Sequence, residues 1–323
     1  MSKQLRPIIN EPLVQEVLLE PIHMGANKLI IISGYVSHIM ASWHIKRISE
    51  LSLSPIDITL TVGMCPIEGL NEDIHEGLRE LVALKDASYS KLDCKYVYQG
   101  NPVHSKVYIW LKENKPFKAF AGSANYTQKG FSSRQREYMV ECDPEVAYKY
   151  YLELENDTIV CNHSEVDDYV RLNSAQPFDG TGINQIPSSQ CSIKLSLLTS
   201  RGDVGYGSGI NWGIRPNGIK REPNQAYIPI PAKIARSGFF PLEKTHFSVV
   251  TDDHKHLIFR VEQANNKALT TPLNNSLLGE YLRNRIGVAN GAFVTKKDLE
   301  QYGRTDVTFY KIDDEQFYMD FSV

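Results

Sequence analysis

His104 and Lys106 stand two positions apart in a mostly apolar segment, residues 104–110 (HSKVYIW). In a β-strand, residues two apart point to the same face, so the imidazole and the ammonium would share one face. Phosphate diesters resist attack because their anionic oxygens repel nucleophiles. An imidazole that attacks phosphorus beside a fixed cation overcomes this repulsion. The pair therefore predicts chemistry on a phosphodiester.

A run of small residues, Ala121-Gly122-Ser123-Ala124-Asn125, follows the next short apolar segment. Small side chains let backbone N–H groups approach an anion closely. The hydroxyl of Ser123 and the carboxamide of Asn125 add side-chain donors. We therefore expect this turn to lie beside His104 and Lys106 and to bind the non-bridging oxygens of a phosphate.

An acidic residue that could orient the imidazole follows in residues 136–141, which alternate apolar and polar like a strand. A carboxylate that accepts a hydrogen bond from one ring nitrogen fixes the tautomer and leaves the other nitrogen free to attack. Glu137 and Glu141 are both candidates, and we favour Glu137.

The order H-x-K, G-S-x-N and a downstream acid resembles the signature of the phospholipase D superfamily over residues 103–141. The resemblance implies a histidine nucleophile, a phosphohistidine intermediate and cleavage that needs no metal or other cofactor. The fuller signature has an aspartate five residues after the lysine, where this chain has Leu111. The compact nuclease branch shares this departure, so a nuclease is favoured over a lipase.

The chain carries one complete signature, because the second H-x-K, His44-Ile45-Lys46, has no G-S-x-N turn after it. One chain thus holds half a site. We expect a homodimer through the catalytic domain, in which the two His104 side chains meet. One imidazole would attack phosphorus and the other, protonated, would donate to the leaving oxygen.

At 323 residues the chain is long enough for two domains. Its five cysteines are widely spaced and include no C-x-x-C, so neither a disulfide framework nor a zinc site is indicated. The first residues lack the apolar core of a signal peptide, and no apolar run approaches the length of a membrane span. We expect a cytoplasmic protein without a membrane partner.

Positive charge is concentrated in one part of the chain, although the net charge is −3. Residues 192–297 contain 15 Lys and Arg against 7 Asp and Glu, a net charge of +8, which leaves −11 for the remainder. A polyanion-binding surface is therefore expected in the second half.

Strand and helix signals alternate in residues 1–175, which predicts an α/β domain with a mixed sheet. The strands are expected at residues 28–35, 57–64, 94–98, 104–111, 117–121 and 138–142, and the helices at residues 42–51, 70–84 and 144–155. Residues 172–189 are rich in Asn, Ser, Gln, Pro and Gly and are the best linker candidate.

Short β segments dominate residues 190–323, which predicts a small, mainly β, partly open barrel. The strands are expected at residues 192–198, 208–213, 227–231, 247–251, 257–263, 307–311 and 317–321, and the helices at residues 232–237 and 276–287. Two polar loops of this domain, residues 198–213 and 262–271, carry groups suited to base edges. The candidate DNA-binding residues are Ser200, Arg201, Asp203, Tyr206, Ser208, Asn211, Trp212, Gln263, Asn265, Asn266, Lys267 and Thr271.

The strand order and the two loops of this second domain resemble the B3-like DNA-binding domain, a pseudobarrel that grips the major groove with two arms. A phospholipase D-like nuclease followed by such a reader is similar to the NgoFVII family of type II restriction endonucleases, related to the metal-independent enzyme BfiI. The resemblance implies a restriction-modification enzyme that cleaves double-stranded DNA at a specific sequence. Some members work with a separate ATPase or helicase-like subunit, and ATP use is expected only through such a partner, since this chain has no G-x-x-x-x-G-K-[ST] loop.

Three other functions remain open at this stage. The same chemistry could serve a phospholipase D-type lipid phosphodiesterase, although the basic second domain argues against it. Asp57, Asp93 and Lys95 loosely imitate the D…D-x-K arrangement of a metal-dependent nuclease. The chain could also be a non-catalytic DNA-binding regulator, but the presence of His104 and Lys106 together with the turn and the acid disfavours this.

Overall fold

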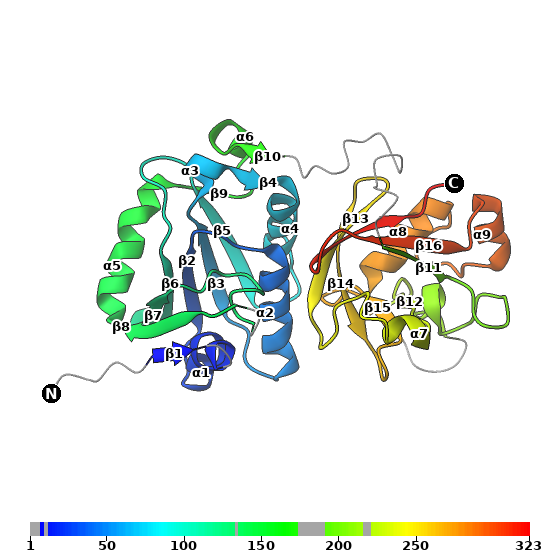
Figure 1. Ribbon diagram of the computed structural model, residues 1–323, viewed down its shortest axis with the longest axis horizontal. Helices are drawn as coiled ribbons and strands as arrows, with labels where there is room; N and C mark the ends of the chain where they lie inside the picture. Colours follow the sequence, from blue (N-terminus) through cyan, green and yellow to red (C-terminus); the bar gives the residue numbers. More distant parts are fainter. Residues whose placement is uncertain (1–6, 10–11, 133–134, 174–190, 216–220) are drawn as a thin grey trace. The chain divides into compact units, whose positions relative to one another are not determined.

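The computed structural model describes residues 7–9, 12–132, 135–173, 191–215 and 221–323. The chain divides into two compact units, Met1–Ala175 and Gln176–Val323, called the N-terminal and the C-terminal unit below (Figure 1). Most of the expected linker, residues 174–189, falls outside the described residues. No helix in the described ranges is both long and apolar enough to cross a membrane.

The N-terminal unit is built on a mixed eight-stranded sheet with the order β1-β8-β7-β6-β2-β3-β5-β9. Its strands are β1 (Pro7–Ile9), β2 (Lys28–Ser33), β3 (Asp57–Val62), β5 (Lys91–Val97), β6 (Lys106–Lys112), β7 (Lys115–Gly122), β8 (Tyr138–Cys142) and β9 (Thr158–Val160). The strands β2, β3 and β5 are parallel to one another, and the other pairs are antiparallel. The expected α/β fold with a mixed sheet is confirmed.

Helices cover both faces of this sheet, with α5 on one side and α2 and α4 on the other (Figure 1). The helices are α1 (Glu20–His23), α2 (His38–Glu50), α3 (Cys65–Glu68), α4 (Glu72–Val82), α5 (Pro144–Leu154) and α6 (Val166–Tyr169), with a π-helix at Val14–Leu19 and a 3-10 turn at Glu155–Asp157. Ala147 and Tyr151 of α5 belong to one apolar cluster with Val107 and Ile109 of β6. Because alternate residues of a strand face opposite ways, Lys106 points to the face away from α5.

Short elements account for most differences from the expected N-terminal fold. The three-residue edge strands β1 and β9 were not predicted, nor was the parallel pair of β4 (Leu70–Asn71) with β10 (Leu172–Asn173). Strands this short contain too few residues to show alternation. In addition, β6 begins at Lys106, so His104 precedes the strand instead of lying in it. That part of the prediction was wrong.

The C-terminal unit is a seven-stranded sheet with the order β11-β16-β17-β13-β14-β15-β12. Its strands are β11 (Ser192–Ser196), β12 (Ile228–Pro229), β13 (His246–Thr251), β14 (His256–Glu262), β15 (Ala268–Thr270), β16 (Asp306–Lys311) and β17 (Gln316–Asp320), and its helices are α7 (Ala232–Ala235), α8 (Ser276–Ile286) and α9 (Lys296–Tyr302). The edge strands β11 and β12 contact each other, so the sheet is nearly closed into a barrel. This architecture confirms the mainly β, B3-like pseudobarrel.

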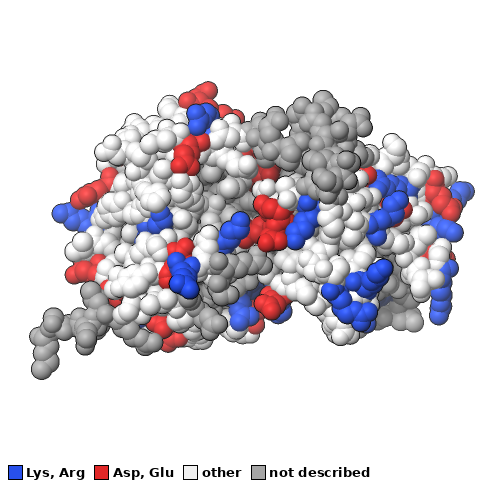
Figure 2. Space-filling view, in the orientation of Figure 1, with Lys and Arg blue, Asp and Glu red and all other residues white. Residues whose placement is uncertain are grey.

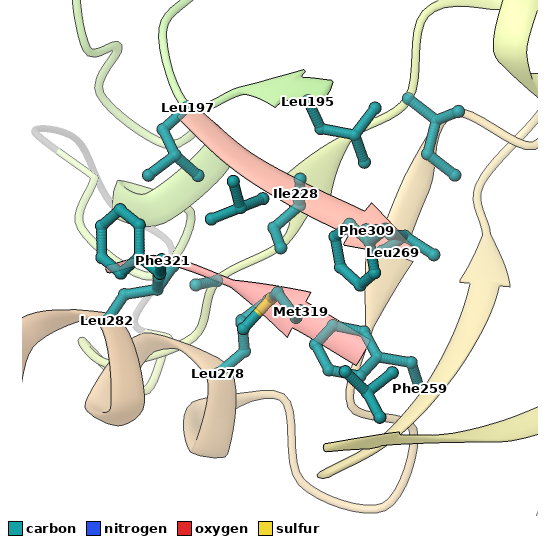
Figure 3. Close-up of a cluster of buried hydrophobic side chains, with 14 of the residues drawn as sticks. Leu195, Leu197, Ile228, Phe259, Leu269, Leu278, Leu282, Phe309, Met319 and Phe321 are labelled. Atoms are coloured by element: carbon teal, nitrogen blue, oxygen red, sulfur yellow. The ribbon is translucent and has the colours of Figure 1, made fainter. Parts of the chain in front are cut away.

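One apolar core fills this barrel (Figure 3). Figure 3 shows side chains from strands far apart in sequence, among them Leu195, Phe259 and Phe309, pointing toward Leu278 and Leu282 of α8. All five are fully buried. Burying a side chain of this size contributes about 1.5–3 kcal/mol, so this core is the main source of stability that the unit has of its own.

Three expectations for the C-terminal unit were wrong. The strand expected at residues 208–213 is a 3-10 turn, Gly209–Asn211, in a glycine-rich stretch that has little strand propensity. The strand β15 lies inside the segment expected to be a loop tip. The helix α9 was overlooked, although its capping box of Thr295 and Asp298 is a recognisable start signal.

Candidate active site

Strand ends bring the candidate residues together at one edge of the N-terminal sheet. Because β6 runs antiparallel to β2, its first residue, Lys106, lies beside the carboxyl end of β2, where Ile32 pairs with Val107. On the other side Lys106 pairs with Gly122, the last residue of β7. The G-S-x-N turn therefore begins next to the lysine, as expected.

His104 and Lys106 are in direct contact. The Lys106 Nζ atom lies 3.1 Å from Nδ1 and 3.3 Å from Nε2 of His104, and it donates to the His104 carbonyl oxygen at 2.6 Å. The imidazole is exposed, whereas Lys106 is only 6% exposed. A nearly buried ammonium thus stands beside a solvent-accessible imidazole, which is the arrangement that attack on an anionic phosphorus centre needs.

The charge of Lys106 is tuned by two opposing effects. Burial lowers the pKa of its ammonium from 10.5, and the negative charge of Glu137 raises it. A buried cation is costly unless an opposite charge is near. Glu137 therefore offsets part of the cost of keeping Lys106 charged inside the fold.

The turn after β7 is fixed to the start of β8. The Ser123 N–H donates to the Tyr138 carbonyl at 2.9 Å, and the Tyr138 N–H donates to Ser123 Oγ at 3.0 Å. The Ser123 hydroxyl donates to a carboxylate oxygen of Glu137. Glu137 is thus hydrogen-bonded to the turn, and its negative charge acts on Lys106. A direct hydrogen bond between Glu137 and His104 stays a prediction. The other acid, Glu141, pairs with Lys118 at 3.4 Å.

Asn125 is oriented by the end of β2. Its Oδ1 atom accepts from the Tyr35 N–H at 3.2 Å and from Ser33 Oγ at 3.3 Å. The single O–H of the buried Ser33 is shared between Asn125 Oδ1 and the nearer Tyr35 carbonyl, at 2.6 Å, and its oxygen accepts from the Tyr126 N–H at 3.0 Å. With its oxygen held in this way, Asn125 offers its Nδ2 donor for an anionic oxygen.

Two glycines lie where the strand ends approach His104. A Cβ atom on Gly63 would lie 1.9 Å from the carbonyl oxygen of Val103, whose N–H donates to the Gly63 carbonyl at 2.9 Å. Gly34 also borders His104, but a Cβ atom there would lie 3.4 Å from the His104 Cα atom, an ordinary contact distance, so only Gly63 is required for the approach. The sequence marks Gly34 only as the end of an apolar run, and nothing in it indicates that Ser33, Tyr35 and Gly63 flank the nucleophile.

The second H-x-K segment lies inside the fold. His44 is fully buried, and its Nδ1 is 2.9 Å from the Tyr126 hydroxyl. Burial lowers the pKa of His44 to about 4. Lys46 donates to the Tyr89 hydroxyl at 3.2 Å. These contacts assign His44 and Lys46 to packing of α2.

The D…D-x-K alternative finds no support in the position of its lysine. Lys95 forms an ion pair of 2.6 Å with Glu155 and donates to the Tyr151 hydroxyl at 3.4 Å. Asp57 and Asp93 lie on neighbouring strands but two register positions apart, since Thr59 is the partner of Asp93. Asp57 and Asp93 nevertheless line one pocket, but Lys95 is not among the residues that line it, so the three residues do not form the expected D…D-x-K site.

The first candidate DNA-binding loop, residues 198–213, exposes Ser200, Arg201, Asp203 and Tyr206. The Thr199 N–H donates to the Asp203 carbonyl at 2.8 Å, which closes a tight turn around Arg201. Ser208 is half-buried, and its hydroxyl lies 3.1 Å from that of Tyr227.

Asn211 and Trp212 of this loop are less exposed than the four exposed candidates that precede them. Asn211 is fully buried, donates to the Val294 carbonyl at 2.8 Å and accepts from the Val294 N–H at 2.9 Å. The Trp212 ring is covered by the guanidinium of Arg221 at 4.4 Å. The expectation that Asn211 contacts DNA is corrected, because its polar groups are used inside the barrel, whereas a DNA contact by the half-buried Trp212 stays a prediction.

The second candidate loop is the hairpin tip between β14 and β15. Gln263, Asn265 and Lys267 are exposed and Asn266 is half-buried. Gln263, Asn265 and Asn266 have φ values of 67°, 61° and 57°, a left-handed conformation that asparagine tolerates well. Thr271 is only 2% exposed, and its hydroxyl donates to the Asn274 carbonyl at 2.7 Å, so its expected DNA contact is also corrected.

Basic side chains are grouped on the C-terminal unit. On the face seen in Figure 2, Lys and Arg side chains gather over the region that this unit occupies in Figure 1. Arg201, Arg236 and Lys267 are among its exposed cations. A locally positive surface of this kind attracts a polyanion even though the whole chain is slightly acidic.

Solved structures similar to the chain are distant. They include NucT from Helicobacter pylori (17% identity, 49% of this chain and 99% of that one, TM-score 0.32) and the phospholipase D family member Nuc from Salmonella typhimurium (13%, 49% and 98%, 0.31). Polyphosphate kinase from Porphyromonas gingivalis (13% identity, TM-score 0.31) matches 48% of this chain, which spans 22% of the kinase. No curated protein matches the chain.

Family models cover both units. Residues 11–168 match the NgoFVII restriction endonuclease N-terminal PLD domain, and residues 185–313 match the NgoFVII C-terminal B3-like DNA-binding domain. The two matches follow the same order as the catalytic signature and the barrel described above. The chain belongs to the NgoFVII restriction endonuclease family, with a phospholipase D-like nuclease domain followed by a B3-like DNA-binding domain.

Proposed function

We propose that this chain cleaves double-stranded DNA at a specific sequence through a phosphohistidine intermediate and without a metal ion. The observation that carries the proposal is the contact of the exposed His104 imidazole with the nearly buried Lys106 ammonium, beside the turn of Ser123 and Asn125. In this proposal the basic C-terminal barrel recognises the DNA sequence.

The reaction has two displacements. An unprotonated nitrogen of His104 attacks phosphorus, a P–N bond forms, and the P–O bond to the 3′ oxygen breaks as that oxygen takes a proton from a second imidazole. Water then attacks the phosphohistidine with the second imidazole as base, which releases a 5′ phosphate and restores both histidines. Lys106 and Asn125 stabilise the charge on the non-bridging oxygens, and the Ser123 hydroxyl joins them by turning from Glu137 to the phosphate. Glu137 orients His104.

Activity in EDTA is the first test of this proposal. Because Lys106 and the turn donors supply the positive field that a metal would provide, plasmid cleavage is expected to continue in excess EDTA. The assay should be run with ATP and genomically adjacent proteins as separate additions, since a partner subunit is part of the expectation. Strict dependence on Mg²⁺ in every arm would contradict the proposed chemistry.

A second imidazole requires a second chain, because each chain has one complete signature. The proposed enzyme is therefore a homodimer through its N-terminal unit. Light scattering is expected to give about twice the chain mass of 36.6 kDa. A monomer that cleaves at a rate independent of protein concentration would contradict the shared site.

Arg201 is the proposed guanine-reading residue, since it is exposed on the tight turn closed by Thr199 and Asp203. Arg201→Ala is expected to reduce discrimination between cognate and scrambled duplex by about 1–3 kcal/mol, because one bidentate contact to guanine is lost. Competitive gel-shift titration measures this. The matched control is Arg236→Ala, an exposed arginine outside both loops. Equal weakening on all sequences would assign Arg201 to a phosphate instead.

A further inference from the structure

Tyr35 lies against the proposed nucleophile. It follows Gly34 at the carboxyl end of β2, and its ring centroid is 5.8 Å from that of His104, with an angle of 85° between the two rings. This edge-to-face geometry is favourable for an aromatic pair. Tyr35 is 40% exposed, so its ring borders the site without being buried in the core.

Tyr35 is held both through its backbone and through its phenol. Its backbone N–H donates to Asn125 Oδ1 at 3.2 Å, and its carbonyl accepts from the buried Ser33 hydroxyl at 2.6 Å. At the far end, the phenol donates to a carboxylate oxygen of Glu68 at 2.6 Å. The bond to Glu68 raises the pKa of Tyr35 above its ordinary value of 10, as expected for a phenol that donates to a carboxylate.

Glu68 is itself fixed, although its side chain is exposed. It ends the short helix α3, where its N–H donates to the Met64 carbonyl at 3.1 Å. Its carbonyl accepts from Asn173 Nδ2 at 2.7 Å. The next residue, Gly69, has φ +71°, and a Cβ atom there would lie 2.4 Å from the Arg171 carbonyl oxygen. The β4–β10 strand pair thus holds the turn that carries the carboxylate.

His104 needs such a support because it precedes β6. Its exposed ring is outside the strand ladder, and Lys106 contacts it on one side. A nucleophile displaced by about 1 Å can lose on the order of a hundredfold in rate. We propose that Tyr35, locked by Glu68, is a positioning residue that holds the His104 imidazole in its attacking orientation. The inference rests on the proposed function, in which His104 is the nucleophile.

Three variants of the full chain test the inference by single-turnover DNA cleavage. Tyr35→Ala removes the ring and is expected to lower the cleavage rate about 30-fold. Tyr35→Phe and Glu68→Gln keep the ring but remove or weaken the hydrogen bond between Tyr35 and Glu68. Each is expected to lower the rate about threefold to tenfold. DNA affinity should stay within about twofold in all three, because the reader is another unit. Equal losses of rate and affinity would overturn the positioning role.

The matched control is Tyr89→Phe. Tyr89 also bonds a charged side chain, Lys46, through its hydroxyl, but it precedes β5 and lies beside the amino ends of β3 and β5, away from the site. Its cleavage rate is expected to be unchanged. A drop as large as that of Tyr35→Phe would show a general effect of tyrosine bonds on the fold and would overturn the inference.

A second readout does not depend on cleavage. In chain labelled with ¹³C at histidine Cε1, the His104 resonance is identified by its loss in His104→Ala. Tyr35→Ala is expected to shift this resonance, while Tyr89→Phe leaves it unchanged. An unmoved resonance sinks the positioning role even if the enzyme cleaves as proposed. If Tyr35→Ala shifts the resonance but His104→Ala still cleaves DNA, the contact between Tyr35 and His104 is supported and the proposed function is refuted.

Discussion

His104→Ala is expected to lower the rate of DNA cleavage by about 10⁴-fold or more, while specific DNA binding stays within a few-fold of wild type. The alanine cannot form the P–N bond, and losses of this size are typical when a catalytic nucleophile is removed. Binding is preserved because the candidate reading loops lie in the C-terminal unit. Nicking of a plasmid and gel-shift titration measure the two quantities side by side.

His23→Ala is the control for this substitution. His23 is an exposed histidine at the end of α1, in a different part of the N-terminal unit's sequence. Its cleavage rate is expected to equal that of wild type. Cleavage by His104→Ala within tenfold of wild type would remove His104 from the mechanism.

Lys106→Met is expected to lower the cleavage rate by about 10²–10³-fold, the usual loss when one group that stabilises transition-state charge is removed. The methionine keeps the length of the side chain but not its charge. Burial lowers the pKa of Lys106, so the fold bears a cost for the charged form at pH values below that pKa. The variant is therefore expected to unfold at a temperature no lower than wild type.

The same pKa shift predicts the alkaline side of the pH profile. As pH rises through the lowered pKa, Lys106 loses its proton, the cost of burial disappears, and catalytic charge is lost. The cleavage rate should therefore fall at a pH below 10.5, the ordinary value for lysine. Lys46→Met, from the other H-x-K segment, is the control and should leave the rate unchanged. A Lys106→Met enzyme with the wild-type rate would refute the role of this ammonium.

Local patterns predicted the long elements and the closeness of His104 to Lys106, although His104 precedes the strand in which it was expected. The apolar run of β2, the alternation in β8 and the Asp143 side chain that caps the N-terminus of α5 are each encoded within a few neighbouring residues. The approach of the G-S-x-N turn to Lys106 follows from a simple antiparallel connection between β6 and β7. These features depend on short-range periodicity, which a sequence displays directly.

Contacts between residues far apart in the sequence could not be predicted from such local patterns. Ser33 and Asn125 are separated by 92 positions, and Tyr35 and Glu68 by 33. The burial of Asn211 depends on Val294, which is 83 positions away. A polar residue in a glycine-rich loop has the same local signature whether it faces DNA or a barrel core. Tertiary packing decides between these positions, and a single sequence does not record it.

The pairing of β1 with β8 also determines how far translation must proceed before the sheet of the N-terminal unit can be completed. Ile8 is made before its partner Met139, which follows about 130 residues later, roughly ten seconds at ordinary rates of synthesis. Glu137 leaves the ribosome in that same late interval. A nascent chain therefore holds His104 and Lys106 for several seconds without the acid or the closed sheet edge. The proposed cleavage thus requires translation at least as far as Glu137 and β8.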